Sequence, residues 1–97
     1  MSYALEIADE AAEDLLALIE SLPSSQRADA TDAVEVELNR LTSDPLPRAK
    51  EHLGRPAHKF TFRTGAITHR WGATYRISED ERSLVITHIY KLPPLVL

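Results

Sequence analysis

The feature that most constrains the fold is an uninterrupted alternation of apolar and polar side chains over residues 67–77. The apolar set, joined by His69, comprises Ile67, Trp71, Ala73, Tyr75 and Ile77. The polar set comprises Thr68, Arg70, Gly72, Thr74 and Arg76. A period of two places neighbouring side chains on opposite faces of a β-strand. The sequence therefore predicts a long strand with one buried face and one open face.

Three further segments are predicted to be strands, namely residues 3–7, 58–63 and 84–90. In the second of them, Phe60 and Phe62 face inward and their charged neighbours face outward. Thr64-Gly65 and the charged residues 78–82 form the turns between the last three strands. The last strand stops at Pro93-Pro94, since proline cannot donate a hydrogen bond to a strand ladder.

Two helices are predicted between the first strand and the others. The first is capped by Asp9, is closed by Pro23, and carries an apolar stripe of Leu15, Leu16, Leu18, Ile19 and Leu22. The second extends from a cap at Ser24 or Ser25 to about Ser43 and buries Ala30, Val34, Leu38 and Leu41. Residues 44–57 are expected to form a proline-rich loop in which Leu53 enters the core.

Residues 1–97 are therefore predicted to form a single α+β domain with the element order β-α-α-β-β-β. The sheet is expected to be antiparallel, with a two-helix hairpin packed on one of its faces. A chain of this length buries one core.

Composition indicates a soluble, cytosolic protein. The chain has 43 % hydrophobic and 27 % charged residues, as is ordinary for a globular domain, and its lack of cysteine suits a reducing compartment. The sequence shows no signal peptide and no apolar run long enough to span a membrane. The four histidines lack ligand spacing and cysteine partners, so neither a metal ion nor a cofactor is expected.

Charge is divided unevenly along the chain. Residues 1–44 hold eleven acidic residues against Arg27 and Arg40, a balance of −9, whereas residues 45–97 hold nine basic residues against four acidic ones, a balance of +5. Such an asymmetry is typical of a protein with an acidic back and a basic binding face. It also arises when helices simply collect Asp and Glu, and the sequence leaves both explanations open.

Several short segments carry a resemblance to a known family. They are a first strand followed at once by a helix, Leu41-Thr42-Ser43-Asp44-Pro45, Leu53-Gly54, Phe60-Thr61-Phe62-Arg63, Thr74-Tyr75-Arg76-Ile77, and the charged turn before Leu84–Ile89. Together they span nearly the whole chain, which resembles the RelE/ParE toxins of bacterial type II toxin–antitoxin pairs. The resemblance implies that the helices lie behind the sheet, that the open face meets the target, and that a cognate antitoxin neutralises the protein.

The resemblance also implies an activity. Members that cleave messenger RNA on the ribosome use no metal; Lys and Arg bind phosphate and stabilise the transition state, and Tyr, His or Glu transfers protons. On this basis the candidate catalytic residues are His88, Tyr90, Arg70 and Arg76, and the candidate RNA-binding residues are Lys59, Arg63 and Lys91. His88 and Tyr90 join the open face if Val85 and Ile89 face the helices.

The sequence departs from the family pattern in two places. Gly72 stands where the family commonly has an arginine, and no tyrosine follows Tyr90. A second function is therefore kept open, a non-enzymatic module that binds DNA gyrase or only an antitoxin. Structural roles stay open too: His69 and Trp71 as core residues, His88 and Tyr90 as sheet-edge residues, and the arginines as solvated residues of an open sheet face.

Overall fold

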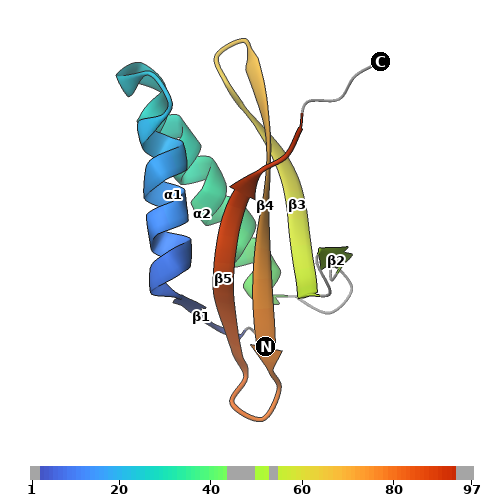
Figure 1. Ribbon diagram of the computed structural model, residues 1–97. Coiled ribbons are helices and arrows are strands. Elements are labelled where there is room, and N and C mark those ends of the chain that lie inside the picture. The colour runs from blue at the N-terminus through green and yellow to red at the C-terminus, as the bar shows by residue number, and fades with distance from the viewer. Residues whose placement is uncertain (1–2, 44–49, 53–54, 94–97) are drawn as a thin grey trace.

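The computed structural model describes residues 3–43, 50–52 and 55–93. Its elements, in chain order, are β1 (Ala4–Ile7), α1 (Asp9–Glu20), a 3₁₀ turn η1 (Ser24–Gln26), α2 (Arg27–Ser43), β2 (Lys50–His52), β3 (Arg55–Thr64), β4 (Ile67–Ser78) and β5 (Ser83–Lys91). The two helices lie together on one face of the sheet (Figure 1). The α+β fold with its helical hairpin on one side is thus confirmed. Leu53, the predicted core residue of the loop, lies outside the described residues.

The sheet differs from the prediction in two respects. Its strand order is β1-β5-β4-β3-β2, and β1 pairs with β5 in the parallel direction, so the sheet is mixed rather than antiparallel. The pairing joins the first strand to the last, and a local two-residue pattern contains no information on strand direction. The short strand β2, which pairs with the start of β3, lies in the segment predicted to be a loop.

The core lies between the helices and the inward face of β3, β4 and β5. The four predicted core residues of α2 are all buried, namely Ala30, Val34, Leu38 and Leu41. In α1 the predicted stripe is wrong at one position, because Leu16 is 58 % exposed. Ala11 is the α1 residue that is fully buried, and Leu16 lies too far around the helix from Ala11 to share its face.

The helix starts are also built differently from the prediction. The residue at the N-cap of α1 is Ala8, without a side-chain cap, and Asp9 belongs to the first turn, where its charge favours the positive end of the helix. Ser24 and Ser25 form η1, and α2 begins at Arg27. The Arg27 side chain donates hydrogen bonds of 3.0 and 3.1 Å to the carbonyl oxygens of Leu22 and Glu20, which closes the C-terminal end of α1.

His69 links the β3–β4 hairpin to the connection between the helices. Its Nε2 lies 2.7 Å from the Thr64 hydroxyl oxygen, and this hydroxyl donates to Gln26 at 2.8 Å. The ring also stacks on Phe62, with 4.9 Å between the two ring centroids. His69 is therefore a half-buried structural residue beside the core, bonded to the Thr64 side chain. Trp71, 2 % exposed, is a core residue.

Acidification is expected to destabilise the fold through His69. Burial, aided by the positive charge of Lys91, lowers the pKa of His69 below its ordinary value of 6.5. The unfolded chain therefore takes up this proton more readily than the folded one. The stability that neutral His69 contributes is complete above pH 6.5 and is lost as the pH falls through the lowered pKa. Urea midpoints at about pH 7.5 and about pH 5 should fall more for the natural chain than for His69→Gln; equal falls would contradict this role.

Candidate functional site

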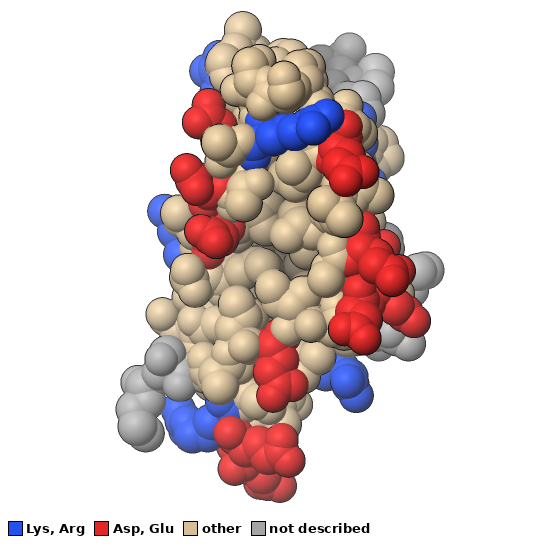
Figure 2. All heavy atoms as spheres, turned by 90° about the vertical axis from the view of Figure 1, so that its left-hand side faces the viewer, with Lys and Arg blue, Asp and Glu red and all other residues tan. Residues whose placement is uncertain are grey.

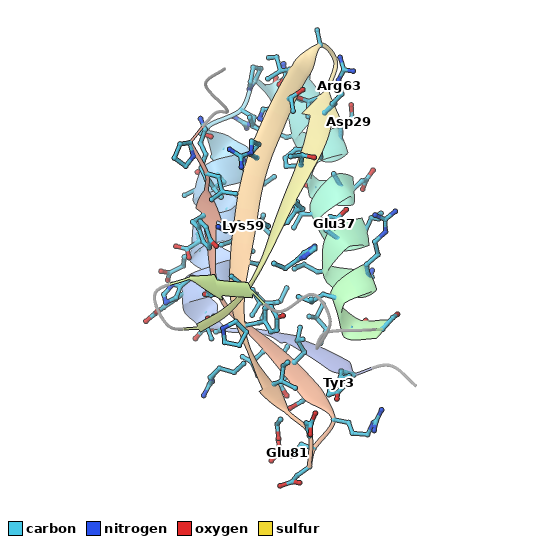
Figure 3. The ribbon with its side chains drawn as sticks, turned by 90° about the vertical axis from the view of Figure 1, so that its right-hand side faces the viewer. Tyr3, Asp29, Glu37, Lys59, Arg63 and Glu81 are labelled. Carbon is cyan, nitrogen blue, oxygen red and sulfur yellow. The ribbon has the colours of Figure 1, made fainter. Side chains whose placement is uncertain are left out.

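The open face of β3 and β4 carries basic residues and no acidic ones among its described positions. Every second residue of β3 and β4 faces the core beneath the helices. The residues between them therefore face away from the helices. These outward positions hold Lys59, Arg63, Arg70 and Arg76, together with threonines, Gly72 and Ser78. Figure 3 shows Lys59 on the side of β3 opposite to Glu37 of α2.

The acidic residues gather on the helical side of the molecule. Helices α1 and α2 hold five and four acidic residues, against Arg27 and Arg40 as their only basic ones. On the side that faces the viewer in Figure 2, carboxylates flank a central strip without charge. The uneven charge of the sequence is therefore a division between the helices and the open face of the sheet, which both of its explanations predict.

The basic side chains of the open face are not neutralised within the described part of the chain. The ion pairs found there use other groups, Arg40 with Glu37, His58 with Glu37, and His88 with Glu10 and Asp14. Arg70 donates a 2.6 Å hydrogen bond to the carbonyl oxygen of Pro93, which holds one end of its guanidinium and leaves its charge uncompensated. Unpaired cations of this kind are what a phosphate group requires.

Lys59 and Arg70 line one shallow pocket of about 230 Å³. Phe60, Thr61 and Leu92 complete its lining. In the register of β3 with β4, Thr61 lies opposite Arg70, and Lys59 lies opposite Gly72. Lys59 and Arg70 are therefore diagonal neighbours on one face, with roughly 7–8 Å between their positions. A single phosphate group is within reach of both side chains.

The other predicted cations are not brought into this pocket. Arg76 lies six residues along β4 from Arg70, which corresponds to roughly 20 Å. Arg63, at the hairpin end of β3 (Figure 3), is a diagonal neighbour of Arg70, but it lies four residues, or roughly 13 Å, from Lys59 and does not line the pocket. Lys91 pairs with the buried Trp71, and its charge acts on His69, so it lies with the opposite face of the sheet.

His88 turns toward α1. Its Nε2 lies 3.5 Å from a carboxylate oxygen of Glu10, and its Nδ1 lies 3.4 Å from one of Asp14. The same Asp14 oxygen accepts a 3.1 Å hydrogen bond from the backbone amide of Ile89. These contacts fix the imidazole at the edge of β5, with 43 % of its side chain exposed. His88 does not reach the pocket of Lys59 and Arg70 in this orientation.

A β-bulge explains why simple alternation fails in β5. Thr74 pairs with His88 but Tyr75 pairs with Ile86, which leaves Thr87 as an extra residue. The Thr87 hydroxyl instead lies 2.7 Å from that of Thr74. Ile86 and Ile89 are both buried, although they are three residues apart. Of the two residues on which the placement of His88 and Tyr90 was made conditional, Ile89 faces the core, whereas Val85 pairs with Arg76 of the open face.

Tyr90 lies on the open face, across Gly72. Gly72 pairs with Lys59 on one side and with Tyr90 on the other. A Cβ atom placed on Gly72 would lie 2.6 Å from Cζ of Tyr90 and 2.7 Å from its hydroxyl oxygen. The hydroxyl oxygen is buried, and burial raises the pKa of Tyr90 above its ordinary value. The sequence alone did not indicate this contact, although a glycine within a strand often marks a close approach.

The described residues contain no group of three or more His, Cys, Asp or Glu side chains placed to hold a metal ion. None of the described helices has the length and apolar character needed to cross a membrane. The chemistry visible in this part of the chain is that of cations and an aromatic ring on the sheet face opposite the helices.

The sequence matches no protein-family model, and it has no similar sequence among curated proteins. Solved structures, in contrast, are similar over nearly the whole chain. A chain of the RelBE2 toxin–antitoxin complex from Mycobacterium tuberculosis is 23 % identical, with a TM-score of 0.57, covering 95 % of this chain and 100 % of that one. A chain of the intact Escherichia coli RelBE toxin–antitoxin complex is 14 % identical, with a TM-score of 0.61 and coverages of 96 % and 100 %.

The isolated E. coli RelE toxin is 12 % identical, with a TM-score of 0.59 and coverages of 97 % and 88 %. The chain has the fold of the RelE toxins. The resemblance drawn from short sequence segments is thereby confirmed at the level of the fold. The comparison concerns the fold alone. The Lys59–Arg70 pocket and the position of Tyr90 over Gly72 are formed by the side chains of this chain.

Proposed function

We propose that this chain is the toxin of a type II toxin–antitoxin pair and that it binds and cleaves messenger RNA on the ribosome. One observation carries the proposal. Within a RelE fold, Lys59 and Arg70 meet in a pocket on a sheet face without acidic residues at its described positions, and neither has a carboxylate partner in the described part of the chain. Such a surface attracts a polyanion, and its geometry suits the phosphates of an extended strand.

The pocket supplies the electrostatic part of RNA cleavage. In that reaction the 2′-hydroxyl oxygen bonds to the adjacent phosphorus, and the bond from phosphorus to the 5′-oxygen of the next nucleotide breaks. The products are a 2′,3′-cyclic phosphate and a 5′-hydroxyl group. Negative charge builds up on the phosphate oxygens meanwhile, and hydrogen bonds from Lys59 and Arg70 stabilise it. Arg63 and Arg76 are left as outer contacts for neighbouring phosphates or the ribosomal surface, whereas Lys91 lies with the opposite face of the sheet.

A proton must also leave the 2′-hydroxyl and another must reach the 5′-oxygen. Of the two residues expected to do this, His88 has a side chain that is 43 % exposed, and we propose that its ring turns from Glu10 and Asp14 toward the pocket when RNA binds. We therefore expect His88→Gln to lower the rate of transcript cleavage by roughly 10²–10⁴-fold, as loss of a general acid or base does, while RNA affinity stays unchanged. Cleavage on purified ribosomes and RNA binding, measured in parallel, check this. Cleavage at the natural rate would remove His88 from the mechanism.

The Lys59–Arg70 pocket also indicates the chemistry of a protein partner. The RelE neighbours include complexes with the antitoxin RelB. By analogy, a cognate antitoxin would bind this chain in the bacterial cytoplasm and neutralise it. A partner that covers Lys59 and Arg70 must supply negative charge, because burying unpaired cations is costly. An acidic segment in the protein encoded by the adjacent gene is the expected match.

A second candidate is a non-enzymatic RelE-like module that binds DNA gyrase or only an antitoxin. The orientation of His88 toward α1 and the buried hydroxyl of Tyr90 favour it, since both keep proton-transfer groups away from the pocket. Expression without the antitoxin separates the candidates. Growth arrest with transcripts cut inside codons indicates the ribonuclease, growth arrest with an SOS response indicates gyrase, and unaffected growth indicates a module that binds only an antitoxin.

A further inference from the structure

The two residues that follow β5 lie against the Lys59–Arg70 pocket. Beyond β5 the chain turns toward β3 (Figure 1), and Leu92 lines the pocket together with Lys59 and Thr61 of that strand. The backbone amide of Leu92 donates a 2.8 Å hydrogen bond to the carbonyl oxygen of Arg70, which continues the pairing of β5 with β4 by one residue. Leu92 and Pro93 are called the strap below.

The strap also holds the side chain of Arg70. The guanidinium Nη1 donates a hydrogen bond of 2.6 Å to the carbonyl oxygen of Pro93, so that Arg70 is bonded to the strap through both its backbone and its side chain. The acceptor is a neutral amide oxygen. A phosphate oxygen is ionised, which makes it a stronger acceptor for a guanidinium, and a phosphate group can take two parallel bonds. A phosphate can therefore replace the Pro93 oxygen at Arg70.

Two consecutive prolines explain why this carbonyl oxygen is available and well directed. Proline has no amide hydrogen, so the strand ladder cannot continue through Pro93. Its ring fixes its own φ angle, and Pro94, the next residue in the sequence, restricts Pro93 to extended conformations. The oxygen is thus held in one direction by a stiff backbone. Because Pro93 is exposed to solvent, its displacement costs little buried surface.

We infer that the strap is an autoinhibitory latch, in which the carbonyl oxygen of Pro93 occupies the guanidinium of Arg70 until a phosphate group displaces it. This rests on the proposed binding of phosphate by Arg70 but not on cleavage. Release of the strap and binding of a phosphate are coupled, because both need the same guanidinium. The latch keeps weakly bound anions such as chloride from Arg70 and admits the stronger acceptors of a polyanion.

Pro93→Gly/Pro94→Gly loosens the strap in the full chain without changing its charge or its cations. Glycine loses more conformational freedom than proline when it is held in one place, so the latch should open more often. Affinity for a short uridine oligomer should then rise roughly 3- to 10-fold, as expected when a competing hydrogen bond is lost. Arg70 should also react faster with phenylglyoxal, which modifies accessible guanidinium groups. Peptide mass spectrometry compares its rate with that of Arg76, exposed on the same face.

Leu95→Gly/Val96→Gly is the matched control, because it places the same two glycines beyond Pro93 in the sequence. The affinity for the oligomer and the reactivity of Arg70 should both keep their natural values in this variant. Circular dichroism and the urea midpoint show that the two variants fold alike. If the control raises affinity and reactivity as much as Pro93→Gly/Pro94→Gly does, flexibility after Pro93 explains the effect, and the latch is overturned.

The two measurements separate failure of the latch from failure of the proposed function. If Arg70 in Pro93→Gly/Pro94→Gly reacts at the natural rate and affinity for the oligomer does not rise, the latch is overturned. If Arg70 reacts faster while affinity stays natural, the latch stands and the assignment of Arg70 to RNA binding is overturned. Faster reaction of Arg70 together with tighter binding supports both.

Discussion

Replacing Lys59 and Arg70 together with alanine is expected to abolish growth arrest and to weaken binding of single-stranded RNA by roughly 10- to 100-fold. Each substitution would remove a hydrogen bond between charged groups. We take the lower part of the usual range of free energy for such a bond, because Lys59 is exposed to solvent. The dependence of affinity on salt should also decrease, by about 0.7 in the logarithmic slope for each phosphate that is no longer neutralised. Toxicity in a culture and binding at several salt concentrations give the two measurements.

Two single variants make this result specific to the pocket. Arg40→Ala removes one positive charge from the helical side, where the side chain is 60 % exposed, and should leave RNA affinity unchanged. Arg76→Ala removes a charge from the open face at a distance from the pocket and should have a small effect that disappears at high salt. Equal losses of affinity in Arg40→Ala and in the double variant would show that net charge, and not the pocket, determines binding.

Leu41→Ala should cost about 2–5 kcal/mol of unfolding free energy, whereas Leu16→Ala should cost less than about 0.5 kcal/mol. The two substitutions remove the same atoms, but Leu41 is fully buried and Leu16 is 58 % exposed. A cavity therefore forms at position 41 alone. Urea unfolding followed by circular dichroism measures both. Because the leucines belong to α2 and α1, similar losses of stability would mean that the packing of α1 against the sheet differs from that described.

The elements of the fold were predictable because their patterns are local. The alternation over residues 67–77 became β4, and the helical spacing of Ala30, Val34, Leu38 and Leu41 became the buried face of α2. The error at Leu16 arose because leucines occupy two faces of α1, and hydrophobicity alone does not distinguish the face that meets the sheet. The apolar stripe in the sequence of α1 was wider than the part of the helix surface that is buried.

The candidate site was less predictable because it depends on relations between strands. The bulge at Thr74/Tyr75 changes the facing of β5 side chains, and no residue in β5 signals it. Lys59 and Arg70 are both predictable as cations of an open face, but their meeting depends on the β3–β4 register. The placement of Tyr90 required both a glycine on β4 and a ring opposite it on β5.

The parallel pairing of β1 with β5 has a consequence for how the protein is made. Ala4 is matched with Ser83 and Ile7 with Ile86, so the beginning of the sheet has no neighbour until these late residues exist. Contacts between residues so far apart in sequence form slowly, and they form after the local contacts. A chain emerging from the tunnel of its own ribosome therefore carries β1 without its partner strand until residues 83–86 have emerged as well. Completion of the sheet, and with it the surface that would engage a ribosome, is delayed until synthesis has passed residue 86.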